Sequence, residues 1–338
     1  MRKISISVIA IIIVAAIFLA GEAYAYLPSD RGFSSNVNVT DDSIQYSIGA
    51  QGAYVSSAIL IDNGDLKPVK ELYIYRDTTY KSDVYEEGIT ATGSQVFTQD
   101  YYIDQLTKNL RFRGVTNIKI MGAEELRAQL QSDIDAALVS QKGLVFIAGA
   151  IPNIIFGDSD ILENWIDSGG FLYWAGNVIG RSMSTHDDVI TVNKQSEFVG
   201  TDSFSGWKTA TEDTKYRSTF SYENQRLEYT PDTSGQSSDI LKTGITDDGT
   251  HYSVTFIKKG NGQICICGGS FHSPQIHDMA ISIASGLTYK SQVIDFKESE
   301  FNRSFSNSFV KPVPAGNISI YISVGKYHCA YAERHDLF

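Results

Sequence analysis

GLVFIAGAIPNIIFGDSDILENWIDSGGFLYWAGNVIG, residues 143–180, is the stretch that decides the fold. Its apolar opening, residues 144–148, is too short for a helix and is ended by Gly149, which is typical of a strand buried on both faces of a parallel sheet. Residues 160–167 follow with an acidic start and apolar side chains at helical spacing. A glycine pair ends that helix, and the aromatic run at residues 171–174 begins a second buried strand. The stretch therefore predicts a β-α-β unit.

The same alternation of strands and helices continues on both sides of this unit. Apolar runs bounded by turn residues predict strands, and amphipathic segments predict helices. The resulting order implies right-handed crossovers and an α/β fold with a doubly wound, mainly parallel sheet. The further strands are predicted at residues 69–75, 117–121 and 263–267, and the further helices at residues 100–112, 123–138 and 276–287, with a break of the second near residue 132.

The segments outside this core are predicted to be linkers and additional strands. Residues 26–68 begin as a polar linker, residues 26–42, and continue as N-terminal strands. Residues 181–261 alternate short apolar segments with Asp, Gly, Ser and Thr, which predicts a β-rich insertion that ends in a hairpin across residues 259–262. Residues 291–338 add C-terminal strands and a polar tail.

The N-terminus has the form of an export signal. Residues 1–25 contain a basic start, an apolar run and a small-residue cleavage pattern at Ala23-Tyr24-Ala25, which predicts a secretory signal peptide. The apolar run, residues 4–20, is at the short edge of what spans a bilayer, so an uncleaved membrane anchor is the alternative. In both cases the remaining chain is expected to be extracytoplasmic, either secreted or anchored to the outer face of the cell membrane by its N-terminus.

Three sequons begin at Asn38, Asn302 and Asn317. In an exported chain they are candidate glycosylation sites, and chance occurrence is the alternative. The formal net charge of −11 argues against nucleic acid and anionic membrane surfaces as partners, so contact with the membrane is expected only through the N-terminal segment. No phosphate-binding glycine motif follows the strand at residues 69–75, and no cofactor is predicted.

Residues 69–180 and 262–290 resemble the class I glutamine amidotransferase-like domains, which are flavodoxin-like α/β domains. The resemblance is carried by GLVFIAGAIP at residues 143–152, by the helix and glycine-led strand that follow it, and by GQICICGGSF at residues 262–271. The leader and the acidic body also resemble those of exported prokaryotic surface proteins.

This resemblance implies a cysteine nucleophile in a glycine-rich turn after a central strand, with a histidine and an acid late in the chain. The corresponding turns here, residues 149–152 and 176–178, contain no Cys, Ser or Thr. A covalent mechanism needs such a nucleophile, so amidotransferase or peptidase chemistry is not expected at this position.

A ligand site is nevertheless expected outside the carboxyl ends of the strands, where open α/β sheets bind their ligands. Four segments are predicted to meet there, namely residues 76–78, 149–153, 176–181 and 268–272. The alternative is that their glycines only turn the chain and end helices. The candidate ligand-binding residues are Asp77, Gly149, Asn153, Gly176, Asn177, Arg181, Ser270 and His272.

Cys267 and His272 are the weak candidates for a nucleophile pair. Cys267 lies inside a predicted strand, where a buried structural thiol is the simpler interpretation. Cys265 is two residues away on the same face, a poor geometry for a disulfide between the two, whereas either could pair with Cys329.

No metal site is predicted. His277 and Asp278 are adjacent on a predicted helix and project in different directions, so a site with His272 would need further ligands. The acidic loop at residues 77–87 lacks the glycine-punctuated spacing of a calcium loop.

These features favour a non-catalytic extracytoplasmic domain that binds a small molecule, a glycan or an envelope protein. One alternative is an extracellular hydrolase acting on glycan or peptide, with His272 and acids of residues 76–87 in its pocket. The other alternative is a structural component of the cell envelope. A pocket with a hydrogen-bonded Cys267–His272 pair or a carboxylate pair would favour the enzyme, whereas an edge filled by loops would favour binding or structure.

Overall fold

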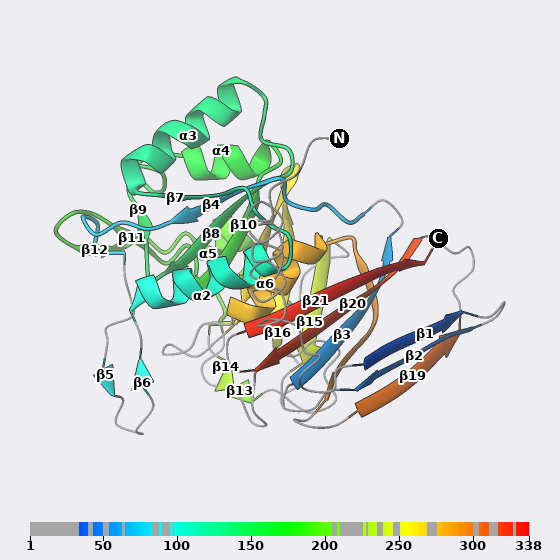
Figure 1. Ribbon diagram of the computed structural model, residues 1–338. Coiled ribbons are helices and arrows are strands. Elements are labelled where there is room, and N and C mark those ends of the chain that lie inside the picture. The colour runs from blue at the N-terminus through cyan, green and yellow to red at the C-terminus, as the bar shows by residue number, and fades with distance from the viewer. Residues whose placement is uncertain are drawn as a thin grey trace, which may run out of the picture.

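The structure is a computed structural model, and its main parts are a seven-stranded sheet with helices on both faces and two antiparallel sheets built from the two ends of the chain (Figure 1). It describes residues 34–39, 43–49, 54–62, 65–82, 88–89, 95–96, 98–204, 208–209, 226–227, 229–234, 239–245, 251–268, 276–299, 304–310, 317–326 and 329–337.

The seven-stranded sheet confirms the predicted α/β fold with a mainly parallel sheet. Its strand order is β15-β16-β17-β10-β8-β4-β7, in which β7, β4, β8, β10 and β17 are parallel and β16 and β15 add an antiparallel edge. The strands are β4 (Glu71–Tyr75), β7 (Ile118–Met121), β8 (Lys142–Ala148), β10 (Phe171–Gly176), β15 (Ile240–Ile245), β16 (Tyr252–Lys259) and β17 (Gly262–Cys267).

The centre of this sheet is the β-α-β unit of residues 143–180. Strands β8 and β10 pair in parallel from Gly143 opposite Phe171 to Ala148 opposite Gly176. Side chains of β8 alternate between two apolar clusters, because Phe146 belongs to one and Val145 to the other, and both are fully buried. The sheet is therefore covered on both faces, as the unbroken apolar run predicts.

Two helices cover each face of the sheet. Helices α2 (Gln99–Phe112) and α6 (Ile276–Ser285) pack together on one face, and α3 (Ala123–Asp135) and α4 (Ile161–Asp167) pack together on the other (Figure 1). The predicted break in the second helix is wrong, since α3 is continuous to Asp135. No helix within the described ranges has the length and apolarity to cross a membrane, and the predicted leader lies outside those ranges.

A buried polar network lies at the amino ends of β4 and β8. Asp133 of α3 is only 2% exposed, and its carboxylate accepts hydrogen bonds from Tyr73 Oη at 3.0 Å and Trp165 Nε1 at 3.3 Å. Lys142 Nζ lies 2.6 Å from Asp133 Oδ1 and 3.1 Å from Glu71 Oε2. These contacts raise the pKa of Lys142 against the effect of burial, which lowers it. The network thus joins α3, α4 and two central strands through one carboxylate.

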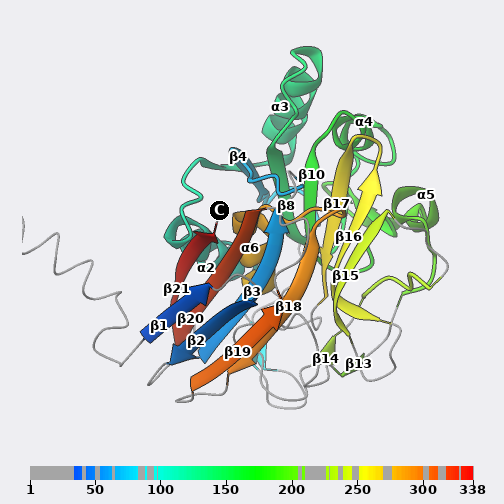
Figure 2. The ribbon, with the colours of Figure 1, turned by 90° about the vertical axis from the view of Figure 1, so that its right-hand side faces the viewer.

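The strands at the two ends of the chain pair with each other. One sheet has the order β1-β2-β19 and the other the order β18-β3-β20-β21, all antiparallel, and they lie side by side in both views (Figures 1 and 2). Part of the predicted linker is therefore a strand, and so is the predicted polar tail. The strands are β1 (Ser34–Val39), β2 (Ser43–Gly49), β3 (Tyr54–Asp62), β18 (Gln292–Ser299), β19 (Ser304–Val310), β20 (Asn317–Lys326) and β21 (Cys329–Leu337).

The region between β10 and β17 differs in two ways from the predicted β-rich insertion. It contains a short helix, α5 (Gln195–Val199), and its strands β15 and β16 extend the central sheet. The hairpin across residues 259–262 is confirmed, because it joins β16 to β17. The remaining short strands among the described residues are β5 (Gly88–Ile89) and β6 (Gln95–Val96), which lie where a long polar loop from residue 76 to residue 98 is predicted, and β9 (Ile151–Pro152), β11 (Ser182–Ser184), β12 (Val189–Thr191), β13 (Lys208–Thr209) and β14 (Arg226–Leu227).

Candidate functional site

The carboxyl ends of β4, β8 and β10 are neighbours in the sheet. The chain passes from β4 to β7 on one side of β4 and then to β8 on its other side. Ligands of open α/β sheets bind at this kind of position. The candidate site is therefore the edge formed by the residues that follow these three strands.

The crevice between β4 and β8 is occupied by Gln99, the first residue of α2. Gln99 is fully buried, its Nε2 donates to the Ile147 carbonyl at 2.6 Å, and its Oε1 accepts from Arg76 Nη1 at 3.2 Å. Thr98 caps the helix and fixes its first residue, since its side chain accepts from the Tyr101 amide. The first residue of α2 therefore bonds to the end of β8 and to the residue that follows β4, at the position where a ligand would be expected.

Arg76 is held in place by a second contact with the start of α2. Its Nε and Nη2 bind the two carboxylate oxygens of Asp100, the latter at 2.9 Å. This hydrogen bonding lowers the pKa of Asp100 below its usual range. The guanidinium group of Arg76 is thus bonded to Gln99 and Asp100 at the start of α2.

Ser82 closes the same edge from the other side. Its hydroxyl lies 2.8 Å from Tyr75 Oη and 2.6 Å from Ser184 Oγ, and its carbonyl accepts from the Gly149 amide at 2.7 Å. Ser82 and Ser184 are 1% and 0% exposed. The amide of Gly149, predicted as a ligand donor, is therefore satisfied within the chain.

Asp77 is an anchor for α3. Its Oδ2 accepts from the Ala123 amide at 2.7 Å, and its Oδ1 accepts from the Thr79 amide at 2.6 Å and the Thr79 hydroxyl at 2.7 Å. Burial opposes ionisation, but these donors outweigh it and hold the pKa of Asp77 below its usual range. The carboxylate therefore caps the helix from a distant segment, because the N-cap residue itself, Gly122, has no side chain.

Gly176 and Asn177 end β10 in a close contact with β8. Gly176 has φ +151°, and a Cβ at this position would lie 1.8 Å from the Ala148 carbonyl oxygen. The Asn177 amide donates to that same oxygen at 3.3 Å, and the Asn177 carbonyl accepts from Trp174 Nε1 at 2.8 Å. Asn177 Oδ1 is buried and has no hydrogen-bond partner among the described residues.

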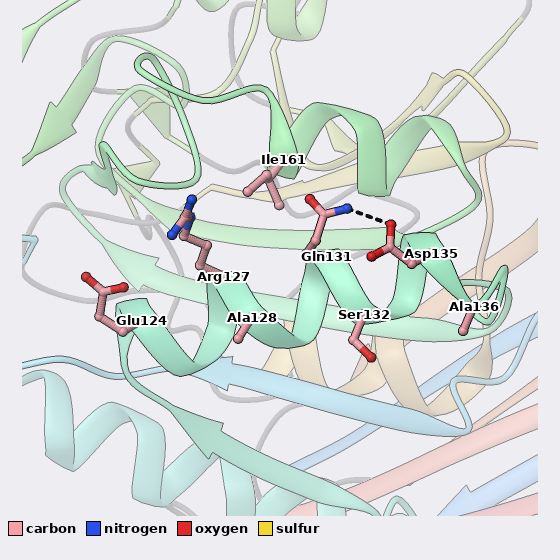
Figure 3. A pocket seen from close by; sticks show the side chains of 8 residues that line it. All are labelled: Glu124, Arg127, Ala128, Gln131, Ser132, Asp135, Ala136 and Ile161. Atoms are coloured by element: carbon pink, nitrogen blue, oxygen red, sulfur yellow. Dashed lines mark hydrogen bonds between the residues drawn. The ribbon is translucent and has the colours of Figure 1, made fainter.

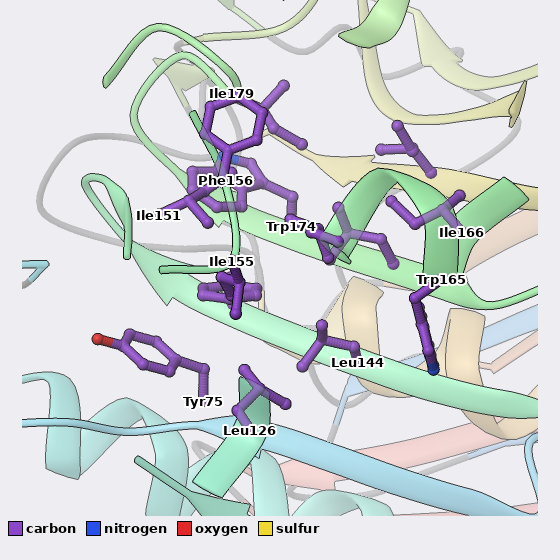
Figure 4. Packing of buried hydrophobic residues seen from close by; sticks show 14 of the residues in the cluster. Tyr75, Leu126, Leu144, Ile151, Ile155, Phe156, Trp165, Ile166, Trp174 and Ile179 are labelled. Carbon is purple, nitrogen blue, oxygen red and sulfur yellow. The ribbon is translucent and has the colours of Figure 1, made fainter. Parts of the chain in front are cut away.

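The turn after β8 is covered by its own apolar residues. Ile151, Ile155 and Phe156 are fully buried and pack with Tyr75 and Ile179 over the end of the sheet (Figure 4). These apolar side chains therefore cover the end of the sheet at this turn.

The exposed part of the edge is polar. Asn153 donates from Nδ2 to Asp158 Oδ2 at 2.7 Å and is half-buried, whereas the side chain of Arg181 is exposed. His186 is exposed, and its ring is tilted by 41° against that of Tyr80 with the ring centroids 4.3 Å apart. This exposed polar surface is available for contact with a partner.

The remaining predicted residues lie partly within and partly outside the described residues. Ser270 and His272 lie outside the described residues, as does Asn302. Cys267 is 2% exposed, and its Sγ lies 3.9 Å from that of Cys265 without a disulfide, so the shared face is confirmed. Asn38 is exposed in β1. Asn317 begins β20 and Cys329 begins β21.

A hollow of the surface lies elsewhere, along α3. It has a volume of about 710 Å³ and a mixed polar lining, in which Gln131 Nε2 donates to Asp135 Oδ1 at 2.8 Å (Figure 3). No group of three or more His, Cys, Asp or Glu side chains that could hold a metal occurs among the residues described. The residues that line the hollow are Glu124, Arg127, Ala128, Gln131, Ser132, Asp135, Ala136 and Ile161.

Three residues that shape the edge were not predicted, namely Gln99, Ser82 and Ser184. The only signal for Gln99 is its place after a helix-capping threonine, which predicts a helix start but not the reach of its amide. The serines are in polar segments whose burial depends on the covering strand β11.

No protein-family model matches this sequence, and a search of curated proteins found no match. Among solved structures, a cytoplasmic protein from Salmonella typhimurium is similar over 66% of this chain and 100% of its own, at 12% identity and a TM-score of 0.34. A beta-galactosidase from Bacillus circulans sp. alkalophilus is similar over 78% of this chain and 36% of its own, at 9% identity and a TM-score of 0.37. An exo-beta-1,4-mannosidase from Opitutaceae bacterium strain TAV5 is similar over 64% and 32%, at 12% identity and a TM-score of 0.32.

Proposed function

We propose that this chain is a non-catalytic extracytoplasmic domain that binds a ligand or a neighbouring protein through an amidotransferase-like scaffold. The strand order supports a doubly wound scaffold of this type. Counted along the chain, the parallel strands are arranged in the sheet as second, first, third, fourth and fifth, which is the flavodoxin-like order. The helix pairs on the two faces agree with that arrangement.

The proposal rests mainly on the polar side chains at the carboxyl edge, which form hydrogen bonds within the chain. Gln99 and Ser82 fill the crevice, and Asp77 caps a helix. A general acid or base has to reach a substrate proton, and a nucleophile has to be accessible. Gln99, Ser82 and Asp77 are instead bonded to other side chains or to the backbone, whereas Asn177 Oδ1 is buried without a partner among the described residues.

The binding surface of this proposal is the exposed polar part of the edge, around Asn153, Arg181 and His186. An exposed cation and an exposed histidine in contact with a tyrosine ring suit an anionic or hydroxyl-rich partner, such as a glycan or an acidic face of an envelope protein. The extracytoplasmic location of the proposal rests on the form of residues 1–25.

The catalytic alternative is tested with the chain from residue 26 onward and a panel of ester, amide and glycoside substrates. The expected result is no turnover by the wild type above that of the His272→Ala and Cys267→Ala variants. Turnover that either substitution abolishes would replace this proposal with the extracellular hydrolase.

The binding part is tested with fluorescently labelled chain and envelope preparations from cells that lack the protein. Arg181→Glu is expected to reduce the bound fraction, whereas Lys258→Glu, an exposed site on β16, is expected to leave it unchanged. Equal binding of both variants and the wild type would remove this edge from the binding surface. Fractionation of the producing cells tests the location, since the protein is expected in the medium or with the membrane.

A further inference from the structure

The hairpin of β11 and β12 ends in an exposed apolar edge. Strand β12 is the outer strand of a three-stranded sheet with the order β12-β11-β9, and it lies at the margin of the molecule (Figure 1). Val189 is 53% exposed and Ile190 is 42% exposed. Neighbouring residues of a strand point to opposite faces, so both faces of this strand are open to solvent.

The register of the hairpin shows which backbone groups are available. The Val192 amide donates to the Arg181 carbonyl at 2.8 Å, and the Thr185 amide donates to the Asp188 carbonyl at 2.8 Å. Ile190, opposite Met183, lies between these bonds. In an antiparallel pair the residues alternate in the side to which their N–H and C=O groups point.

It follows that the backbone groups of Val189 and Thr191 point away from β11. No strand pairs with this side of β12 in the part of the chain that the structure describes. An unpaired edge of this kind is a template for another strand.

We propose that β12 pairs with β12 of a second copy of this chain, antiparallel and centred on Ile190. In this register Val189 of one copy lies opposite Thr191 of the other. Both have outward backbone groups, so each pair can exchange N–H···O bonds. The pairing joins the two three-stranded sheets into one continuous sheet across the dimer.

The charges that flank β12 favour the antiparallel direction. Asp187 and Asp188 precede the strand, and Lys194 follows it. Antiparallel pairing brings the acidic end of one copy beside the basic end of the other. Parallel pairing in register would set acids against acids, which destabilises a strand pair. Two copies of the strand are therefore complementary both in their flanking charges and in their outward N–H and C=O groups.

This self-association is argued from the backbone of β12 and not from the crevice or the leader, and the same hairpin carries His186 of the proposed binding surface. Site-specific cross-linking tests it most directly. An Ile190→Cys substitution places the new thiols opposite each other on the two-fold axis, whereas Leu138→Cys places a thiol at an exposed site on another face, 61% exposed in the wild type. Both variants carry Cys329→Ser, and the two other cysteines are buried.

Under mild oxidation, Ile190→Cys is expected to form a covalent dimer several times faster than Leu138→Cys. Equal rates would overturn the proposal.

Sedimentation velocity over a wide concentration range provides a second measurement without a new thiol. The wild type is expected to sediment faster as its concentration rises, and more so in high salt, because salt screens the repulsion between two acidic chains. Thr191→Pro removes one outward N–H and is expected to abolish that dependence, whereas Ile120→Lys on β7 is expected to keep it. A wild type that stays monomeric at the highest concentration, or a strand of another protein seated on β12, would refute the pairing.

Discussion

Asp133 is expected to be a main support of the α/β core, and its removal should cost much of the free energy of unfolding. In the Asp133→Ala variant, Tyr73 Oη and Trp165 Nε1 lose their acceptor, and Lys142 loses its 2.6 Å partner. Removing one partner of a buried ion pair typically costs about 3–5 kcal/mol, because a buried charge is left uncompensated. Glu71 remains 3.1 Å from Lys142, so we expect the lower end of that range, about 3 kcal/mol.

The assay is urea denaturation followed by tryptophan fluorescence. Asp135→Ala is the matched control, because Asp135 is on the same helix, is exposed and accepts only from Gln131 among the bonds described. Substitutions at such exposed sites usually change stability by less than about 0.5 kcal/mol.

A second variant separates charge compensation from packing. In Asp133→Asn with Lys142→Met the buried ion pair is removed as a whole, and replacing a buried pair is often close to neutral. The double variant is therefore expected to be more stable than Asp133→Ala. The reasoning is refuted if Asp133→Ala unfolds within about 1 kcal/mol of the wild type at an unchanged urea dependence, or if the double variant is no more stable than the single one.

Three further predictions concern the carboxyl edge of the sheet. Asp77→Ala should lower stability at neutral pH by about 1 kcal/mol, the usual value of a lost helix cap. Because the pKa of Asp77 is lowered in the folded state, this difference in stability should be present above about pH 3.9 and vanish as the pH falls through the pKa of Asp77 in the folded protein. Unfolding curves in which the difference persists in strong acid would contradict a role of the ionised carboxylate as the cap. Gly176→Ala should cost more than Gly169→Ala, since both glycines have positive φ but only at Gly176 would a Cβ meet a backbone atom; equal thermal midpoints would be the contrary result. Gln99→Ala should cost about 1–3 kcal/mol, because the buried Ile147 carbonyl loses a donor, and equal stability in urea would show that the crevice is not filled as described.

The central sheet could be predicted from the sequence because its signals are local. Residues 144–148 and 171–174 are unbroken apolar runs between glycines, and this pattern alone specifies strands covered on both faces. The hairpin at residues 259–262 is likewise marked by its glycines. The carboxyl edge of the sheet is expected to carry the site because alternating strands and helices give parallel strands, whose carboxyl ends lie at one edge.

The pairing of the terminal strands could not be predicted in the same way. Strand β2 lies between β1 and β19, which are separated by most of the chain, and no local pattern specifies a partner so distant in sequence. The same holds for Gln99 and Ser82, whose contacts depend on where other strands end. Polar groups of this edge are bonded to distant parts of the chain, since Gln99 donates to the Ile147 carbonyl and the Ser82 carbonyl accepts from the Gly149 amide.

The α/β core is inserted in the chain between β3 and β18, two strands that pair with each other. Ile61 of β3 lies opposite Gln292 of β18, so the chain enters and leaves the core at adjacent points. The two connecting segments also hold each other, because the Lys67 amide donates to the Gly286 carbonyl at 2.7 Å. A short turn joining β3 directly to β18 would leave the terminal strands connected as a hairpin. In the intact chain, a pulling force applied to the two ends would act first on the terminal sheets. It would reach the core only after β3 and β18 separate.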